Sequence, residues 1–214
     1  MIAATQEIDK TQINTPISPS DLQIKLIFGS QIEHYLEDLS RLLDIYSEWP
    51  YLYQSSTLEE NKAYLMDRYA RHPESIVCLA FKGKKAIGAA LGVPLDKAPA
   101  HYLKNFPKDE IRSDIFYWGE LVVLPDDRRQ HVAEEIYTKM GNCIKEEKRY
   151  KSICFASLER PADYRLNHLK PKNYSDLTPL WEKLGFKRRD ELQSVGKWTV
   201  IGETEDSLHP MMYW

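Results

Sequence analysis

The sequence predicts a mixed α/β domain. Three observations lead to this class: short apolar runs that suit strands, segments with apolar residues at helical spacing, and an interleaved order of the two without internal repeats. The chain has 214 residues, of which 43% are apolar and 29% are charged. That size and balance are typical of one globular domain with a substantial core. We therefore expect a single domain over residues 21–214.

The N-terminal segment divides into an arm and a first strand. Residues 1–20 are polar, contain two prolines and show no period, so we expect a flexible arm. Residues 22–28 alternate between apolar and polar side chains. This alternation indicates a half-buried strand.

Two helices are expected next. Ser30 and Thr57 are each followed three residues later by a glutamate, which is the pattern of a capping box. Apolar residues at helical spacing follow both positions. We expect helices over residues 30–47 and 57–72.

A hairpin and an insertion follow. Residues 76–81 and 86–95 are apolar runs on either side of Lys82-Gly83-Lys84, which predicts two strands joined by a tight turn. Residues 96–114 contain two prolines and many charges, so we expect an irregular insertion with one short helix.

A strand over residues 115–124 ends at Pro125 and leads through a short turn into a helix over residues 132–148. The first N–H groups of that helix have no partner within the helix. Arg128 and Arg129 lie beside them. A helix start of this kind is a natural site for an anion. A solvated helix start is the alternative interpretation.

The C-terminal part predicts a fifth strand over residues 152–158 and then a short helix. Thr178 is the expected cap of this helix, with Pro179 at its first position and Gly185 just past its end. The remaining strands are expected at residues 186–189, 195–201 and 209–214.

Two motifs in this chain resemble the GCN5-related N-acetyltransferase (GNAT) family. The family carries a strand L-x-V-x-P and then R/Q-x-x-G-x-G/A at the start of a long helix, where backbone amides hold the pyrophosphate of coenzyme A. Here residues 121–125 read LVVLP and residues 128–133 read RRQHVA, so that His131 stands in place of the first glycine. Residues 179–186, PLWEKLGF, resemble the family's A-x-x-L-Y-x-x-x-G-F, with Trp181 in place of the tyrosine.

The resemblance extends over about residues 22–214 and implies a fold and a donor. The fold would be a central, mostly antiparallel sheet of six to seven strands flanked by about four helices. The donor would be acetyl-coenzyme A. Its expected binding residues are Leu121, Val122, Val123, Arg128, Arg129, Gln130, His131, Val132 and Ala133.

The resemblance also implies catalytic residues. Glu120 stands five residues before Pro125, where many members of the family carry a glutamate that accepts the proton of the amine. Desolvation within an apolar strand would raise its pKa and make it a better base, whereas a glutamate that faces solvent or pairs with a lysine is the alternative. Trp181 cannot supply a proton and suits core packing. The general acid would be Tyr174 or Tyr164, or the thiolate would leave unaided.

The acceptor pocket of the family includes the connection between the first two helices. Here that connection carries Trp49, Tyr51 and Tyr53, which are the expected acceptor-binding residues. An aromatic cluster suits an apolar or cationic amine, but it can equally cover a core.

Composition argues against other classes of partner. A net charge of −3 argues against nucleic acid. No apolar run is long enough to span a membrane and the N-terminus lacks signal-peptide features, so we expect a cytoplasmic protein. The histidines lack metal-ligand spacing, so no metal is expected, and the three cysteines are expected to be reduced thiols. A homodimer is an open alternative.

These expectations describe an acetyl-coenzyme A-dependent N-acetyltransferase. The acetyl group would pass to a primary amine of a small molecule or peptide by direct attack in a ternary complex. One alternative is a catalytically inactive coenzyme A-binding or regulatory module of the same fold. Another is transfer of a longer acyl group, or transfer to a hydroxyl.

Overall fold

The computed structural model of the chain describes residues 21–45, 56–104, 106–107, 110–170, 176–200 and 202–214. The predicted arm over residues 1–20 lies outside them. The described helices are α1 (Leu36–Leu43), α2 (Leu58–Leu65), α3 (Ala100–Leu103), α4 (Val132–Glu146) and α5 (Thr178–Lys183). The strands are β1 (Leu22–Phe28), β2 (Ile76–Lys82), β3 (Lys85–Pro94), β4 (Ile115–Val123), β5 (Ser152–Cys154), β6 (Ala156–Leu158), β7 (Arg189–Thr199) and β8 (Asp206–Tyr213).

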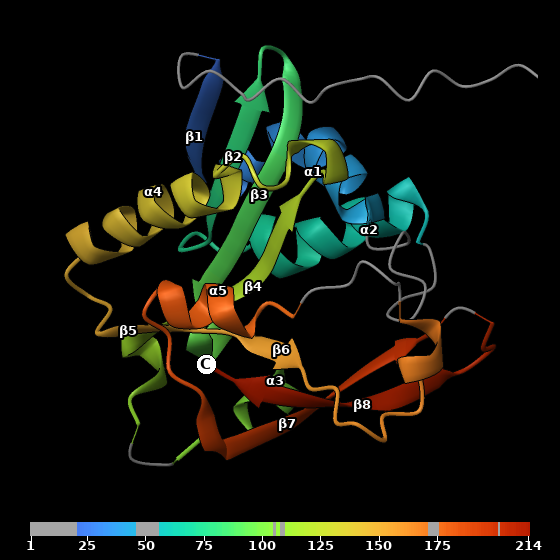
Figure 1. The fold of residues 1–214 in the computed structure, drawn as a ribbon. Coiled ribbons are helices and arrows are strands. Elements are labelled where there is room, and N and C mark those ends of the chain that lie inside the picture. Colours follow the sequence, from blue (N-terminus) through green and yellow to red (C-terminus); the bar gives the residue numbers. More distant parts are fainter. Residues whose placement is uncertain (1–20, 46–55, 105, 108–109, 171–175, 201) are drawn as a thin grey trace, which may run out of the picture.

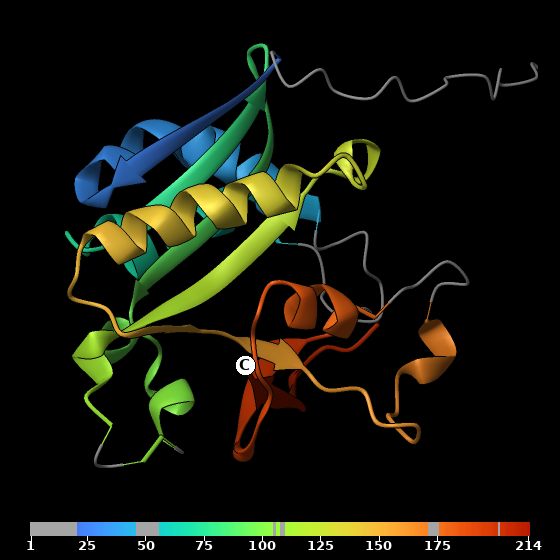
Figure 2. The same ribbon diagram turned by 60° about the vertical axis from the view of Figure 1, so that its left-hand side comes forward.

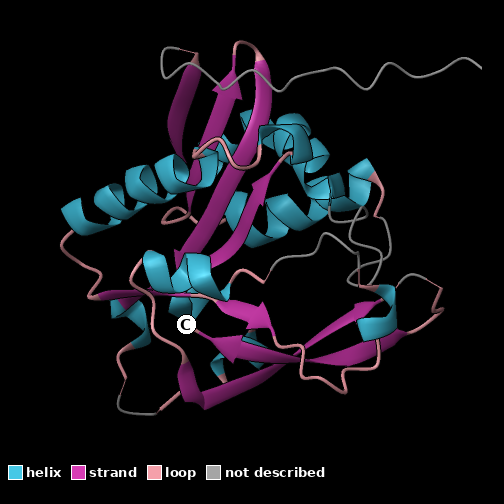
Figure 3. Cartoon of the chain, viewed as in Figure 1, coloured by secondary structure: helices cyan, strands magenta, loops and turns pink. Residues whose placement is uncertain are grey.

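The described strands form two sheets (Figures 1 and 3). The first has the order β1-β2-β3-β4-β5, in which β1 to β4 are antiparallel neighbours and β5 pairs with β4 in parallel. The second has the order β6-β8-β7 and is antiparallel. The predicted class is confirmed, but the single sheet of six to seven strands that we expected is divided into five and three.

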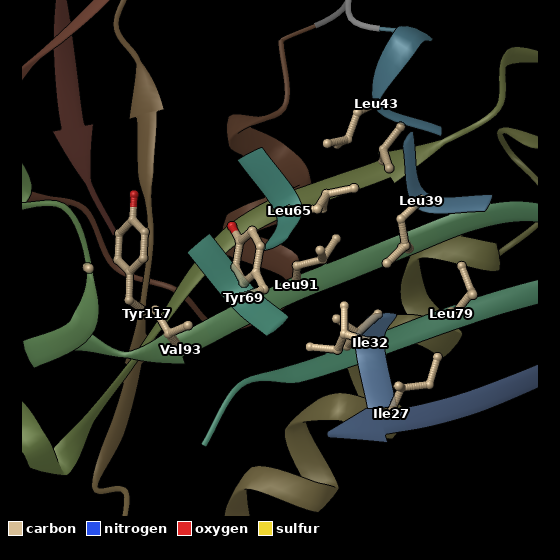
Figure 4. Close-up of a cluster of buried hydrophobic side chains, with 14 of the residues drawn as sticks. Ile27, Ile32, Leu39, Leu43, Leu65, Tyr69, Leu79, Leu91, Val93 and Tyr117 are labelled. Atoms are coloured by element: carbon tan, nitrogen blue, oxygen red, sulfur yellow. The ribbon is translucent and has the colours of Figure 1, made fainter. Parts of the chain in front are cut away.

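Helices cover both faces of the five-stranded sheet, with α1 and α2 on one face and α4 on the other (Figure 2). The strand β2 is buried on both sides, so alternate residues enter different cores. Ile76, Cys78 and Ala80 pack with α4. Val77, Leu79 and Phe81 pack with α1 and α2. Figure 4 shows this second core, where Leu39, Leu65 and Leu91 meet.

The two predicted capping boxes have different outcomes. Around Thr57 the box is complete, because Thr57 Oγ1 accepts a hydrogen bond from the Glu60 N–H (3.2 Å) and Glu60 Oε2 accepts one from the Thr57 N–H (2.7 Å). The box at Ser30 is wrong, because residues 29–35 form a 3₁₀ helix without a side-chain cap and α1 begins only at Leu36. Gly29 makes this turn with a φ of 49° and donates its N–H to Ser75 O (3.1 Å).

The second helix ends in a wider turn than predicted. After α2, residues Met66–Ala70 form a π-helical turn, in which the Arg71 N–H donates to Met66 O (3.2 Å). The hairpin of β2 and β3 forms as expected around Gly83. The insertion contains α3 between the 3₁₀ turns Leu95–Lys97 and Arg112–Asp114.

The predicted strand over residues 152–158 is interrupted at Phe155. Its backbone exchanges hydrogen bonds with Trp214 (3.3 and 3.0 Å), and its ring packs on Trp181 with the ring centroids 4.7 Å apart. The chain therefore leaves β4 after β5 and joins the C-terminal strand as β6. This switch separates the two sheets.

Three other C-terminal expectations need correction. Residues 186–189 are not a strand of their own, because β7 begins at Arg189 and continues through the segment predicted from residue 195. Thr178 is the first residue of α5 rather than its cap, and its N–H donates to Asp176 Oδ1 (2.7 Å). Gly185 ends the helix with a φ of 87°, as expected.

The three cysteines are free thiols. Cys78 and Cys154 are buried, and burial raises the pKa of the Cys78 thiol to about 12. In the described part of the chain, no helix is long and apolar enough to cross a membrane.

Candidate active site

The strand β4 loses its neighbour at the start of the expected donor site. Residues 115–117 pair with β5, whereas β4 continues to Val123 beside β3 alone (Figure 2). The Leu124 N–H donates to Ile87 O (2.8 Å) of the β3 strand. Backbone groups of an antiparallel strand alternate in direction, so those of Leu121 and Val123 point away from β3. Among the described strands, none pairs with β4 along this edge.

The loop after β4 directs backbone N–H groups toward the same end. Arg129 (φ 60°) and His131 (φ 62°) both adopt the left-handed conformation. The first N–H donor bonded within α4 is that of Glu135, which reaches His131 O (3.0 Å), so the N–H groups of residues 132–134 have no partner in the helix. Left-handed residues between ordinary ones make successive N–H groups converge into an anion-binding hollow. The positive end of the helix dipole adds to it.

His131 occupies the position where the family pattern has glycine, and its φ explains that preference. A residue with a Cβ in this conformation costs about 1–2 kcal/mol relative to its right-handed form. The side chain of His131 is 76% exposed, and Nδ1 is hydrogen-bonded to Glu134 Oε2 (2.5 Å). The ring thus turns toward the outer side of the first helical turn.

The side chains of the loop have different surroundings. Arg128 is partly buried and donates from Nε to Val123 O (3.0 Å), which ties the loop to the end of β4. Gln130 donates to Asp126 O (2.8 Å). Arg129 is exposed. The nine expected donor-binding residues lie at the end of β4, in the loop after it and at the start of α4, but the side chains of Val122 and Val132 are buried in the core. Their role in binding stays a prediction.

A negative charge also lies at the start of α4, and it is neutralised locally. Glu134 pairs with Lys183 of α5 and with His131. The hydrogen bonds from Lys183 and His131 hold the pKa of the Glu134 carboxyl below its usual value. Because Glu134 is paired in this way, its negative charge does not cancel the positive potential of the N–H groups at the start of α4.

Glu120 lies in a narrow cleft beside the open edge of β4. The register of β3 and β4 shifts between Leu91 and Gly92, which places an extra residue in β4 at Gly119. Glu120 is partly buried and accepts a hydrogen bond from the Tyr64 hydroxyl at Oε1 (2.6 Å). The cleft has a volume of about 40 Å³, which is room for ordered water. Its lining is rich in tyrosine and consists of Tyr64, Arg68, Tyr69, Val93, Pro99, Tyr102, Tyr117, Gly119 and Glu120.

The π-helical turn after α2 brings two of these tyrosines together. In an α-helix, side chains five residues apart point in different directions, whereas the wider i to i+5 turn places them on one face. The rings of Tyr64 and Tyr69 meet edge to face with centroids 6.1 Å apart. A Cβ on Gly119 would lie 2.3 Å from the Tyr69 hydroxyl, so glycine is required for this close approach.

The hydroxyls of the cleft are held in their protonated form. Burial raises the pKa of Tyr69 and Tyr117 well above the usual value, and the charge of Glu120 raises it further for Tyr69. Tyr64 is 39% exposed as a residue, but desolvation of its hydroxyl and the charge of Glu120 raise its pKa as well. Burial also raises the pKa of Tyr102. These groups are hydrogen-bond donors at neutral pH and poor sources of a proton.

Five other predicted site residues have different outcomes. Trp49, Tyr51, Tyr53 and Tyr174 are outside the described residues. Tyr164 is not at the cleft, because its hydroxyl is bonded to His209 Nδ1 (2.7 Å) in the buried cluster beside the three-stranded sheet.

The tyrosines at the cleft were missed because the sequence signal is weak. Tyr64 and Tyr69 are five residues apart, and this spacing does not match the period of an α-helix. Tyr102 and Tyr117 come from the insertion and from β4, so only the fold brings them to Glu120. Within the described residues, no group of histidine, cysteine or carboxylate side chains is placed to hold a metal ion.

Comparison with known proteins identifies the fold. No family model matches the sequence, and no curated protein matches it either. An acetyltransferase from Thermus thermophilus superimposes with a TM-score of 0.56 at 10% identity, over 91% of this chain and 97% of that chain. The aminoglycoside acetyltransferase AAC(6')-Ib in complex with coenzyme A gives 0.55 at 12% identity, over 90% of this chain and 94% of that chain. The chain has the fold of the GNAT acetyltransferases, as the motifs predicted.

Proposed function

We propose that this protein is an N-acetyltransferase that transfers an acetyl group from acetyl-coenzyme A to a primary amine of a small molecule or peptide. The observation that carries the proposal is the position of Glu120. It lies in a cleft with four tyrosines, and Leu121, the next residue, turns its backbone toward the edge of β4 where no described strand pairs. A base and a strand edge suited to the donor are therefore adjacent.

The donor would bind along β4 and at the start of α4. The backbone groups of Leu121 and the N–H of Val123 are suited to pair with the amide groups of the pantetheine arm, as a neighbouring strand would. The Val123 carbonyl already accepts a hydrogen bond from Arg128 Nε. The N–H groups of residues 132–134, with exposed Arg129, are suited to the pyrophosphate. Val122 packs in the core and would support the edge rather than contact the donor.

The reaction is a direct transfer. The neutral amine nitrogen attacks the thioester carbonyl carbon, so that a C–N bond forms and the C–S bond then breaks. Glu120 takes the proton that the nitrogen loses, through water in the cleft. The sulfur leaves as a thiolate and takes its proton from solvent, because the tyrosines hold their protons too tightly to supply one. Fixing both reactants can contribute about 7–11 kcal/mol to the lowering of the barrier.

Release of the coenzyme A thiol with a panel of amines tests the proposal. Glu120→Gln should lower kcat by about 10²–10⁴-fold. Acetyl-coenzyme A should still raise the midpoint of thermal unfolding, because the variant leaves the donor site intact. Glu182→Gln, at an exposed position in α5, is the matched control and should have wild-type activity.

Two other outcomes have clear meanings. Binding of acetyl-coenzyme A without thiol release for any amine, in both the wild type and Glu120→Gln, would favour an inactive coenzyme A-binding module. Faster release from propionyl- or succinyl-coenzyme A than from the acetyl donor would indicate a longer acyl group.

A further inference from the structure

We propose that the acceptor amine also carries a carboxylate, which binds to Arg68. This inference rests on the proposed function and names its substrate class. Arg68 belongs to the π-helical turn and lines the same cleft as Glu120. It is partly buried, and its guanidinium carbon lies 6.0 Å from the centroid of the Tyr64 ring.

The surroundings of Arg68 show where its charge acts. Burial lowers the pKa of His101, and the positive charge of Arg68 lowers it further. The same charge opposes the increase in pKa that burial causes at Tyr69 and Tyr102. Arg68 lines the cleft together with Tyr69 and Tyr102, and its charge acts on both of these side chains.

No carboxylate in the described ranges forms an ion pair with Arg68. Its sequence neighbour Asp67 pairs instead with Arg71 (2.8 Å), one turn further along. Other arginines of the described chain, such as Arg149 with Glu74, do have carboxylate partners. A guanidinium that is partly removed from water is normally compensated by an anion. Glu120 lines the same cleft and accepts a hydrogen bond from the Tyr64 hydroxyl. A carboxylate on the acceptor would give Arg68 an anionic partner of its own.

The two charges of the cleft complement an amino acid. Glu120 would face the amino group and Arg68 the carboxylate of an acceptor that docks against the cleft, because a volume of about 40 Å³ is too small to enclose the whole molecule. Arginine suits this role because its planar group binds a carboxylate through two parallel hydrogen bonds. The same charge repels polycationic amines, so we expect an acceptor unlike those of an aminoglycoside acetyltransferase.

The test compares matched amines in the thiol-release assay. Each amino acid is measured beside its carboxamide and its decarboxylated amine, and an aminoalkylphosphonate shows whether a different anion can replace the carboxylate. The wild type should have a kcat/KM for the acid that is about 10–100-fold higher than for the amide, the usual worth of charge-assisted hydrogen bonds. Arg68→Gln should remove this preference and leave activity on the amide. Arg68→Lys should retain part of it.

Arg71→Gln is the control, because Arg71 is exposed and pairs with Asp67 on the outer side of the helix. A wild-type preference for amides or polyamines would overturn the inference, as would an equal effect of Arg68→Gln on acid and amide. Either result would leave the proposed transferase activity in place. Absence of thiol release with every amine would instead refute the proposed function.

Discussion

The left-handed conformation of His131 leads to a stability prediction. A residue with a Cβ at a φ of 62° costs about 1–2 kcal/mol, and glycine avoids that cost. Glycine also increases the conformational entropy of the unfolded chain, which lowers the free energy of unfolding by about 0.4–1 kcal/mol. Replacement of His131 further removes its contact with Glu134, an exposed pair that contributes at most about 1 kcal/mol.

His131→Ala is the matched control, because it removes the same contact and keeps the Cβ. We expect His131→Gly to be more stable than His131→Ala by about 1 kcal/mol, as the difference between the two costs. For a chain of this size, that corresponds to a difference of about 2–4 °C in the midpoint of thermal unfolding. Urea denaturation measures the free energy of unfolding directly. An alanine variant as stable as the glycine variant would refute the assignment of strain to this residue.

The same pair of variants also reports on the donor site. The ring of His131 points toward Glu134 and is mostly exposed. Stabilisation by acetyl-coenzyme A should therefore persist in both variants, and its loss in both would mean that the imidazole contacts the donor.

Two further predictions concern backbone geometry. Thr57→Ala should destabilise the protein by about 0.5–2 kcal/mol because it removes a formed cap, whereas Ser30→Ala should be close to neutral in the same urea titration. A similar loss from both would contradict the difference between the two helix starts. Gly119→Ala should destabilise by about 1–3 kcal/mol and lower activity, because the new Cβ meets Tyr69 at 2.3 Å. Gly141→Ala is the control, because a Cβ at this position in α4 meets nothing within 4 Å, and it should stabilise the protein by about 0.5–1 kcal/mol. If Gly119→Ala does not lower stability, the close contact with Tyr69 is refuted.

Local patterns predict most of the secondary structure. The alternation in β1, the continuous apolar runs of β2 and β3, and the helical spacing from Val132 all correspond to elements near the expected bounds. The strand β4 and the start of α4 were also predicted, because a short turn joins two strongly periodic segments. For this reason, the residues of the expected donor site could be named from the sequence.

Features that depend on distant contacts were not predictable. The interruption at Phe155 results from pairing with Trp214, which lies nearly sixty residues further along the chain. The predicted helix start at Ser30 was wrong because a backbone hydrogen bond between Gly29 and Ser75, and not a side-chain cap, fixes this turn. The cleft around Glu120 combines segments separated by the hairpin and the insertion. None of these contacts leaves a local signal.

Amide hydrogen exchange with and without saturating acetyl-coenzyme A is the most direct test of the proposed donor site. We place the donor on the backbone of Leu121, Val123 and residues 132–134. Exchange at these amides should slow on binding, because the donor would occupy them as hydrogen-bond partners. Amides of β7, in the other sheet, should be unchanged. Protection elsewhere, with exchange at these five amides unaltered, would contradict the proposed donor site.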